Sequence, residues 1–464
     1  MTQLEIRDKA TQERIGEVSI AQREDVDRAV GAAREAYVAW CRVPVVERAR
    51  SLFRYADGLE RRREEIALSV SRENGKTLAD ARAEVRRGIE AVEFACGMPS
   101  LMMGDALTDV ARGIDSSSVR YPLGVCAGIT PFNFPAMIPL WMFPIAIAAG
   151  NTFVLKPSPQ TPLTSELLLE VAAACGFTSG VLGVVHGGAQ TAHALIEHPD
   201  VAAVSFVGSS NAARAVQEHA VRAHKRVQAL GGAKNYMIVM PDAVDSVTCE
   251  AIIGSAFGGA GQRCLAGSVV VAVGDAGDAL APMLVRAASK LQLGRGVDEE
   301  TEMGPVVSDE ALARISGYVQ RALASGAKPL LCYPSRVKDS LPGAFFSPVI
   351  FDHVDPAGEL ARDEIFGPVL AVVRAGSLDE AITIANGSRY GNASSIFTRS
   401  GGSARTFASR IEVGMAGINI GIAAPMAFFP FGGVKDSIFG DLRCHGKDAV
   451  AFYTQQRVVI SRWP

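Results

Sequence analysis

The sequence predicts an α/β fold built from two parallel-sheet domains in tandem, with a small β element added to them. Short apolar runs alternate with helical ones, as in VCAGIT followed by PAMIPLWMFPIAIAAG, and NTFVLKP followed by TSELLLEVAAACG. This alternation indicates parallel strands with helices on both faces. A second alternating series begins near NYMIVMPDA and ends near GINIG. The length of 464 residues agrees with this organisation, because domains average roughly 150 residues.

Three segments outside the alternating series are predicted separately. Residues 22–100 are expected to be helical, because Arg and Glu recur against Ala, Leu and Val at three- and four-residue spacing. The stretch from Ser71 to Lys76 interrupts this pattern and is predicted to be a helix end and turn. Residues 105–124 are polar and turn-rich, which favours a projecting hairpin. The C-terminal AFYTQQRVVISRWP is typical of a strand whose partner is distant in sequence or belongs to another subunit.

Composition and charge narrow the class of partner. Hydrophobic residues make up 48% and charged residues 20%, and the net charge of −3 is too near zero for a dedicated nucleic-acid or membrane-surface binder. No signal peptide is recognised, and the longest apolar stretch is interrupted by Pro144, Gly150 and Asn151. The eight cysteines are scattered, with no CxxC pair and no Cys/His cluster at metal-ligand spacing. We therefore expect a cytoplasmic protein with reduced thiols, a small-molecule substrate and no metal.

Residues 257–268, FGGAGQRCLAGS, place Cys264 in an unusual setting. A lone cysteine in an apolar run is usually inert core. Here glycines surround it, so that the backbone is free to approach another group closely, and Arg263 stands beside it. A neighbouring cation favours the thiolate, which is the nucleophilic form of cysteine. These residues alone leave both core packing and a catalytic nucleophile open.

Three further motifs offer groups that a cysteine nucleophile and a nucleotide cofactor require. In PFNFP, Asn133 could donate to an oxyanion, although Asn in a turn is common. Lys156 ends the strand in FVLKPS, where open α/β sheets bind phosphate or ribose, although a solvated lysine is the simpler alternative. In FVGSS, Gly208 and Ser209 precede a helix and could cradle a diphosphate or simply cap the helix. No GxGxxG fingerprint is present.

Six blocks, taken together and in order, carry a resemblance: GITPFNFP, GNTFVLKPS, SFVGSS, FGGAGQRC, EIFGPV and PFGGVKDS. Through them the chain resembles the aldehyde dehydrogenase superfamily along essentially its whole length. The resemblance implies an aldehyde dehydrogenase-like α/β fold of two Rossmann-type domains and a small β oligomerisation element. Residues 1–103 and 123–232 would form the cofactor-binding domain and residues 233–447 the catalytic domain. Residues 104–122 and 448–464 would bridge the subunits of a homodimer or homotetramer.

The resemblance also implies roles for individual residues. Cys264 would attack an aldehyde to form a thiohemiacetal, and Asn133 together with the Cys264 backbone N–H would stabilise its oxyanion. Hydride would pass to a nicotinamide cofactor and leave a thioacyl-enzyme. The residues expected to contact that cofactor are Thr130, Phe132, Lys156, Gly208, Ser209, Glu364 and Phe366.

One position departs from the pattern of the hydrolytic members. Most of them carry a glutamate 34 residues before the nucleophile, and here that position is Leu230, with no acidic residue between Lys225 and Asn235. A leucine cannot act as the general base that activates water. This departure, together with GAKNYMIVMPDA, FGD and FYTQ, makes the chain resemble the CoA-acylating methylmalonate-semialdehyde dehydrogenases, in which coenzyme A releases the acyl group.

The same branch implies a substrate that carries a carboxylate. Arg263, beside the nucleophile, could bind that carboxylate bidentately. Arg87, in VRRGIEAVEFA, matches a second arginine near the substrate entrance, and Arg86 is the alternative by one residue of register. Pro159 stands where NAD-preferring members often carry a glutamate, so NAD is expected with NADP as the alternative.

Three functions remain to be separated. The first is CoA-acylating oxidation of malonate or methylmalonate semialdehyde by NAD. The second is a hydrolytic NAD(P)-dependent dehydrogenase that uses another base and releases the free acid. The third is a non-catalytic homologue that keeps the fold, and the joint presence of Cys264, Asn133, Lys156 and Glu364 argues against it.

Overall fold

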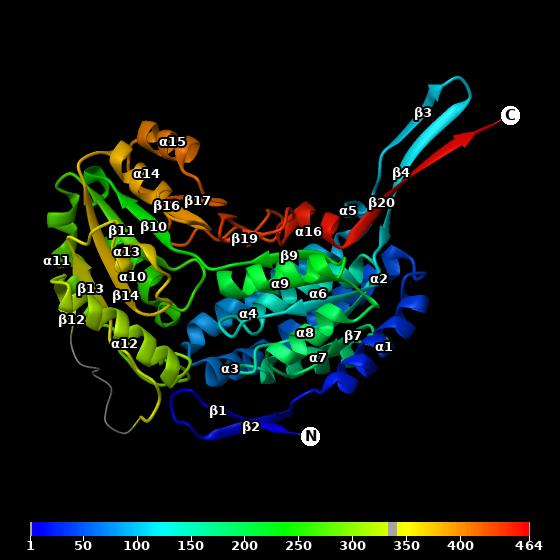
Figure 1. The fold of residues 1–464 in the computed structure, drawn as a ribbon, viewed down its shortest axis with the longest axis horizontal. Helices are drawn as coiled ribbons and strands as arrows, with labels where there is room; N and C mark the ends of the chain where they lie inside the picture. Colours follow the sequence, from blue (N-terminus) through cyan, green and yellow to red (C-terminus); the bar gives the residue numbers. More distant parts are fainter. Residues whose placement is uncertain (1, 333–340, 464) are drawn as a thin grey trace.

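The protein is described by a computed structural model that covers residues 2–332 and 341–463. Figure 1 shows two α/β bodies side by side and a β arm that projects from one of them. Each body is organised around its own sheet, one of six strands and one of seven, and the arm is a sheet of three strands. In the described part of the chain, no helix is both long enough and apolar enough to cross a membrane.

The six-stranded sheet has the strand order β19-β9-β8-β5-β6-β7. Five of its strands run parallel, and β19 is antiparallel to β9. β5 and β6 are buried at every position, so their apolar runs are uninterrupted, as in parallel sheets covered on both faces. The strands are β5 (Val125–Ile129), β6 (Thr152–Lys156), β7 (Leu182–Val184), β8 (Val201–Val207), β9 (Arg226–Leu230) and β19 (Ile438–Phe439).

Helices cover both faces of this sheet. On one face, α6 contacts β5 and β6 on its inner side and α2 and α4 on its outer side, and it is apolar around its circumference. On the other face, α1, α8 and α9 pack directly on the strands. The helices of this body are α1 (Arg23–Trp40), α2 (Val45–Arg61), α3 (Arg63–Asn74), α4 (Leu78–Cys96), α5 (Met98–Leu101), α6 (Met137–Ala148), α7 (Leu163–Ala174), α8 (Ala189–Glu197) and α9 (Ser210–Arg222).

The predicted interruption of the N-terminal helical region is present. α3 ends at Asn74, and Gly75 follows with a left-handed backbone of φ 95°. The Thr77 hydroxyl then accepts a hydrogen bond from the Asp80 N–H and begins α4. This turn sets the direction of α4, whose first two turns border the site described below.

The seven-stranded sheet has the order β12-β13-β14-β11-β10-β16-β17, and β12 alone is antiparallel to its neighbour. One hydrophobic cluster joins its strands to the helices on its faces. The strands are β10 (Asn235–Val239), β11 (Gly267–Val273), β12 (Lys328–Cys332), β13 (Val349–Asp352), β14 (Val369–Ala375), β16 (Ala393–Phe397) and β17 (Met415–Ile418). The helices are α10 (Ser246–Phe257), α11 (Ala276–Ala288), α12 (Asp309–Ala324), α13 (Glu359–Arg362), α14 (Leu378–Asn386) and α15 (Gly401–Arg410).

The arm confirms the predicted hairpin and gives the C-terminal strand a partner in its own chain. β3 (Ala106–Ala111) and β4 (Ile114–Pro122) form the hairpin, and β20 (Thr454–Arg462) pairs antiparallel with β4 along its full length. Residues 448–452, expected in this element, belong instead to α16 (Gly446–Phe452), which is largely buried in the body. The domain boundaries proposed from the sequence otherwise remain predictions.

Short pairings complete the molecule. β1 (Gln3–Arg7) and β2 (Arg14–Ser19) form an N-terminal hairpin, and β15 (Tyr390–Gly391) pairs with β18 (Val434–Lys435). All eight cysteines lie in the described part of the chain and are free thiols.

Candidate active site

The loop that carries Cys264 is tightly packed at its glycines. Cys264 follows the 3-10 turn η2 (Gly258–Gly261) and precedes β11. A Cβ at Gly258 would lie 2.5 Å from the Arg263 guanidinium, and a Cβ at Gly261 would lie 2.3 Å from the Gly367 carbonyl oxygen. Gly261 also has a left-handed backbone, with φ 70°. Side chains are absent from this run because neighbouring groups already occupy the space that they would fill.

The Cys264 thiol is protonated at neutral pH in this structure. Burial raises its pKa to about 12, and the negative charge of Glu364 acts in the same direction. The backbone N–H groups of Cys264 and Leu265 favour the thiolate, and the charge of Arg263 does so to a smaller extent. Arg263 thus acts in the expected direction. Its effect is smaller than that of desolvation, so the net pKa of the thiol is raised.

Two cavities meet at Cys264, which is the only one of the described residues that lines both. The first has a volume of about 200 Å³ and is bounded by α4, α6 and the chain between β17 and α16. The second has a volume of about 320 Å³ and lies at the carboxyl ends of β5, β8 and β9. We call them the α4 cavity and the strand-end cavity. A thiol at their junction can meet one small molecule from each side.

The strand-end cavity brings together most of the residues predicted to contact a cofactor. Phe132 and Phe366 meet edge to face, with 5.8 Å between their ring centres. Ser209 caps α9 by accepting a hydrogen bond from the Ala212 N–H, so the N-terminus of this helix opens on the cavity. The predicted residues that line the cavity are Phe132, Asn133, Gly208, Ser209, Cys264, Glu364 and Phe366.

Glu364 is the only carboxylate among the described residues that line the strand-end cavity. Its Oε1 accepts a hydrogen bond from the Ala233 N–H at 2.8 Å. A Cβ at Gly232 would lie 2.2 Å from the carboxylate, so a glycine is required for this close approach. Burial raises the pKa of Glu364 to about 7, more than the nearby charge of Lys234 lowers it. Both protonation states of this side chain are therefore accessible near neutral pH.

Asn133 is held against the Cys264 loop. Its side chain is buried, and Nδ2 donates to the Gln262 carbonyl oxygen at 3.0 Å. A carboxamide carries two N–H hydrogens, so one remains for another acceptor. Together with the Cys264 N–H, this group suits the oxyanion that forms when a thiolate adds to a carbonyl.

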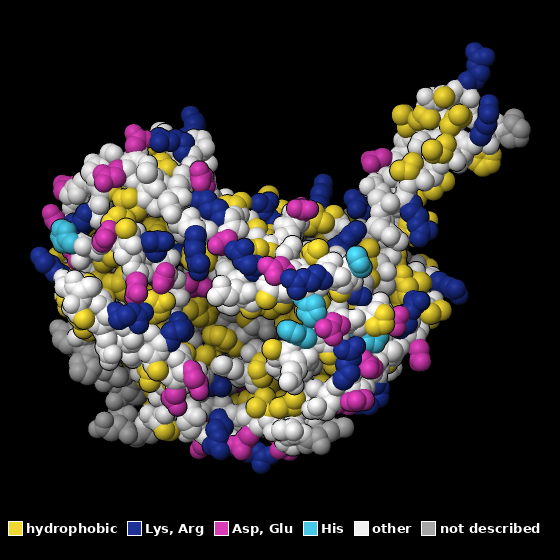
Figure 2. All heavy atoms as spheres, viewed as in Figure 1, with side chains coloured by type: hydrophobic (Ala, Val, Ile, Leu, Met, Phe, Trp, Pro, Cys, Tyr) yellow, Lys and Arg dark blue, Asp and Glu magenta, His cyan; other side chains and the backbone are white. Residues whose placement is uncertain are grey.

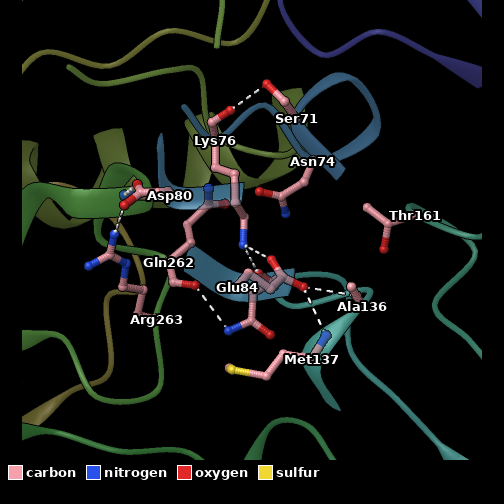
Figure 3. A network of polar contacts seen from close by, with 12 residues as sticks. Ser71, Asn74, Lys76, Asp80, Glu84, Ala136, Met137, Thr161, Gln262 and Arg263 are labelled. Carbon is pink, nitrogen blue, oxygen red and sulfur yellow. Dashed lines mark hydrogen bonds and ion pairs between the residues drawn. The ribbon is translucent and has the colours of Figure 1, made fainter. Parts of the chain in front are cut away.

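A buried ion pair between Lys76 and Glu84, shown in Figure 3, supports the backbone of Asn133. Lys76 Nζ lies 2.6 Å from Glu84 Oε2 and donates to the Asn133 carbonyl oxygen, also at 2.6 Å. The other Glu84 oxygen accepts hydrogen bonds from the backbone N–H groups of Ala136 and Met137 at the start of α6. Both charged side chains are at least nine-tenths buried. Each member of the pair also makes hydrogen bonds to the backbone between β5 and α6, so the pair holds this loop relative to α4.

The two arginines predicted to bind a carboxylate both line the α4 cavity, but each already has an acidic partner. Arg263 lies 2.6 Å from Asp80, which also accepts a hydrogen bond from the Gly259 N–H. Arg87 lies 3.2 Å from Glu90. An incoming carboxylate would therefore share these guanidinium groups with Asp80 and Glu90.

Arg86, the alternative to Arg87, lies outside the cavity. It is half-exposed and pairs with Glu60, Glu90 and Glu93. Of these two neighbouring arginines, Arg87 is therefore the one that lines the α4 cavity.

Two predicted cofactor residues, Thr130 and Lys156, are not among the described residues that line the strand-end cavity. Lys156 is buried, and its Nζ donates to the carbonyl oxygens of Pro157 and Gly187 at 2.7 and 2.8 Å. Burial lowers its pKa to about 8. The Thr130 hydroxyl is also buried and has no hydrogen-bond partner among the described residues.

Sequence reasoning missed several residues of the α4 cavity. Lys76 was expected only to end a turn, and Glu84 lies in a helix that carries many other acidic residues. Trp141 and His445 lie far apart in the chain, yet their rings meet at 4.4 Å between centres. On the opposite side, Arg314 lines the strand-end cavity and donates to the Ile365 carbonyl oxygen. No local motif marks these residues, because each depends on a contact between distant segments.

Leu230 occupies the last position of β9 and is buried in the hydrophobic cluster that Cys264 also contacts. It pairs with Ile438 of β19. Position 230, at which the hydrolytic members would carry a glutamate as general base, is therefore occupied by a buried apolar side chain.

Comparisons with known proteins agree with this geometry. The profile of the Aldehyde dehydrogenase family matches residues 1–459. Malonate-semialdehyde dehydrogenase 2 of Geobacillus thermodenitrificans is 51% identical over 455 residues, which cover 98% of this chain and 94% of that protein.

Two solved structures match the whole chain. One, from Sinorhizobium meliloti 1021, is assigned as a methylmalonate-semialdehyde dehydrogenase complexed with NAD; its TM-score is 0.98 at 42% identity, covering 100% of this chain and 95% of that one. The other is methylmalonate-semialdehyde dehydrogenase from Oceanimonas doudoroffii, with a TM-score of 0.98 at 43% identity, covering 100% and 96%. The predicted fold class is confirmed.

Proposed function

The chain belongs to the aldehyde dehydrogenase family, and from this premise we propose that it oxidises malonate or methylmalonate semialdehyde with NAD and transfers the acyl group to coenzyme A. The observation that carries the proposal is the position of Cys264 at the junction of two cavities. The α4 cavity, with its arginines, would take the carboxylated aldehyde. The strand-end cavity would take the nicotinamide.

The chain's own residues account for the first step. Once the thiol has lost its proton to solvent, the Cys264 sulfur bonds to the aldehyde carbon and the carbonyl oxygen becomes an oxyanion. The free Nδ2 hydrogen of Asn133 and the Cys264 N–H would donate to that oxygen. The bound cofactor would supply the acceptor for the hydride that leaves the same carbon, and Cys264 would then carry the acyl group as a thioester. Coenzyme A thiolate then bonds to the acyl carbon, and the bond to the Cys264 sulfur breaks.

The residues of the strand-end cavity fit a nicotinamide dinucleotide. The N-terminus of α9, with Gly208 and Ser209, suits a diphosphate. Glu364 can accept hydrogen bonds from ribose hydroxyls, and Phe366 offers an aromatic wall for the ring. The buried Thr130 hydroxyl, which lacks a partner among the described residues, could also bind the cofactor.

Leu230 supports coenzyme A rather than water as the acceptor of the acyl group. General-base assistance is usually worth about 10²–10⁴-fold in rate, and a buried leucine cannot provide it. A thiol with a pKa near 8.5 is a few per cent thiolate at neutral pH and is intrinsically more nucleophilic than water. We infer that thioester hydrolysis is slow in this enzyme.

Pre-steady-state kinetics test this inference directly. Without coenzyme A we expect a burst of reduced cofactor equal to the number of active sites, followed by a slow steady rate. Coenzyme A should raise that rate and give an acyl-CoA product, and Leu230→Glu should increase hydrolysis. Fast turnover to the free acid without coenzyme A would contradict the proposal and favour the hydrolytic alternative.

NAD is the proposed cofactor, with NADP as the alternative. NAD is bound in the Sinorhizobium structure. Pro159 carries no carboxylate to bind the ribose hydroxyls or to repel a 2′-phosphate. Comparing kcat/KM for the two cofactors measures the preference, and a preference for NADP would contradict this choice.

The arm is proposed to join subunits in a homodimer or homotetramer. Hydrophobic side chains gather on it in Figure 2. Leu107, Val458 and Ile460 are each more than 60% exposed, which is costly unless a partner covers them. Light scattering should show a dimer or tetramer for the full chain and a shift to smaller species for Val458→Glu/Ile460→Glu.

The eight free thiols favour a reducing compartment such as the cytoplasm.

A further inference from the structure

His445 occupies a strained position at the edge of the α4 cavity. It immediately precedes α16 and has a left-handed backbone with φ 70°, which is uncommon for a residue with a side chain. The strand-like contact between Phe431 and Cys444 holds the preceding backbone, and the Gly446 N–H donates to the Ala427 carbonyl oxygen. The fold therefore fixes the direction of this side chain at an energetic cost.

The imidazole of His445 is buried and has unused hydrogen-bonding capacity. The residue is 4% exposed, and neither ring nitrogen has a hydrogen-bond partner among the described residues. The planes of the His445 and Trp141 rings are nearly perpendicular, at 88°. The centre of the Phe431 ring lies 5.7 Å from the centre of the His445 ring. A buried polar group without a partner is energetically unfavourable. The ring lines the α4 cavity, so a ligand there is able to supply the missing partner.

The charges around His445 are balanced, which leaves a neutral hydrogen-bond donor free to act on a ligand. Burial and the positive charge of Arg87 lower the pKa of His445 to about 3, so the ring is neutral and has one N–H donor. The six charged residues of the cavity form three ion pairs, Lys76–Glu84, Asp80–Arg263 and Arg87–Glu90. The arginines are thus partly neutralised, and an additional neutral donor would strengthen carboxylate binding without adding repulsion.

We propose that His445 is a specificity-determining residue, whose imidazole N–H donates a hydrogen bond to the carboxylate of a short semialdehyde acid while Cys264 holds the aldehyde carbon. This inference rests on the proposed function. In malonate semialdehyde a single methylene separates the aldehyde and the carboxylate, so both groups must fit in one small space. At about 200 Å³ the α4 cavity is smaller than typical drug-sized pockets of about 300–1,000 Å³.

The principal alternative is that His445 is only an aromatic packing residue beside Trp141 and Phe431. His445→Leu removes both ring nitrogens and keeps an apolar side chain, whereas His445→Gln restores an N–H donor. His445→Gly provides a second donor-free variant that tolerates the left-handed backbone. His198→Leu is the matched control, because His198 is also buried but lines neither cavity.

The assay compares kcat/KM for malonate semialdehyde with that for propanal, which has no carboxylate. We expect His445→Leu and His445→Gly to lower the ratio of the two values tenfold or more, His445→Gln to recover at least part of it, and His198→Leu to leave it unchanged. Malonate should protect Cys264 of the wild-type protein from iodoacetamide and protect His445→Leu much less. Melting temperatures of all variants report whether the fold is kept.

Two results would overturn the inference. One is a ratio within threefold of wild type in both donor-free variants. The other is an equal loss on both aldehydes with malonate protection unchanged, which would assign His445 to packing. If the wild-type protein itself shows no preference for malonate semialdehyde over propanal, the proposed substrate fails first. A preference that survives His445→Leu removes only the role of His445.

Discussion

The two cavities that meet at Cys264 are built in different ways. The strand-end cavity is lined mostly by loops at the carboxyl ends of β5, β8 and β9, each of which is one short run of sequence, and is completed by Cys264, Arg314, Glu364 and Phe366. The α4 cavity is made by faces of α4 and α6 and by the chain before α16, which come from three distant parts of the sequence. The first is a general site of parallel α/β sheets. The second is where we propose that the substrate preference of this chain is set.

The largest effect is expected at the residue that the two cavities share. Cys264→Ala removes the only described side chain that lines both of them and should abolish cofactor reduction. Because no strand-end loop is altered, NAD should bind with an affinity close to that of wild type. Isothermal calorimetry and a turnover assay separate the two outcomes. Retained turnover would show that another group is the nucleophile.

The contrast also explains what the sequence could predict. Asn133, Gly208, Ser209 and Glu364 stand in compact motifs, and the structure gathers all of them on the strand-end cavity. Thr130 and Lys156 come from the same motifs but are buried and do not line the cavity, because side-chain direction depends on local packing.

The α4 cavity was largely beyond prediction from the sequence. The Arg263–Asp80 hydrogen bond joins residues 183 positions apart, and nothing near either residue identifies the other. His445 depends likewise on Trp141, to which no sequence pattern connects it. The sequence identified Arg263 as a candidate substrate residue but did not identify Asp80 as its partner. The negative charge of Asp80 partly neutralises the guanidinium that a substrate carboxylate would bind. Both sheets, by contrast, followed from the alternation of apolar and helical runs.

The second-largest effect is expected at Asn133, which lines the strand-end cavity while its backbone is held by Lys76 of the α4 cavity. Asn133→Ala removes a side-chain donor while the Lys76 hydrogen bond to its backbone carbonyl remains possible. Loss of one oxyanion donor typically costs about 10²–10³-fold in kcat. We expect a loss in this range, measured as single-turnover cofactor reduction, with little change in NAD affinity. A change under about threefold would contradict the role of Asn133.

A smaller and more selective effect is expected in the α4 cavity. Arg263→Leu removes a guanidinium that is already shared with Asp80. It should therefore raise KM for malonate semialdehyde by roughly thirtyfold, which corresponds to about 2 kcal/mol, the low end of the usual range for a buried charge contact. KM for propanal should change far less. Arg86→Leu is the control, because Arg86 lies outside the cavity. Equal losses on both aldehydes would mean that Arg263 supports the fold or the loop instead.

The smallest effect concerns the thiol itself and the charge beside it. Because burial raises the pKa of Cys264 to about 12, the thiolate fraction should increase about tenfold per pH unit and show no plateau between pH 6 and 9. Iodoacetamide labelling of the peptide that contains Cys264, followed by mass spectrometry, measures this rate without interference from the other seven cysteines. Arg263→Leu should shift the rate by less than about threefold at any one pH, since the Arg263 charge is a minor influence on this pKa and desolvation is the dominant one. A plateau near pH 7, lost in Arg263→Leu, would instead show that the arginine beside the nucleophile activates it in the free enzyme.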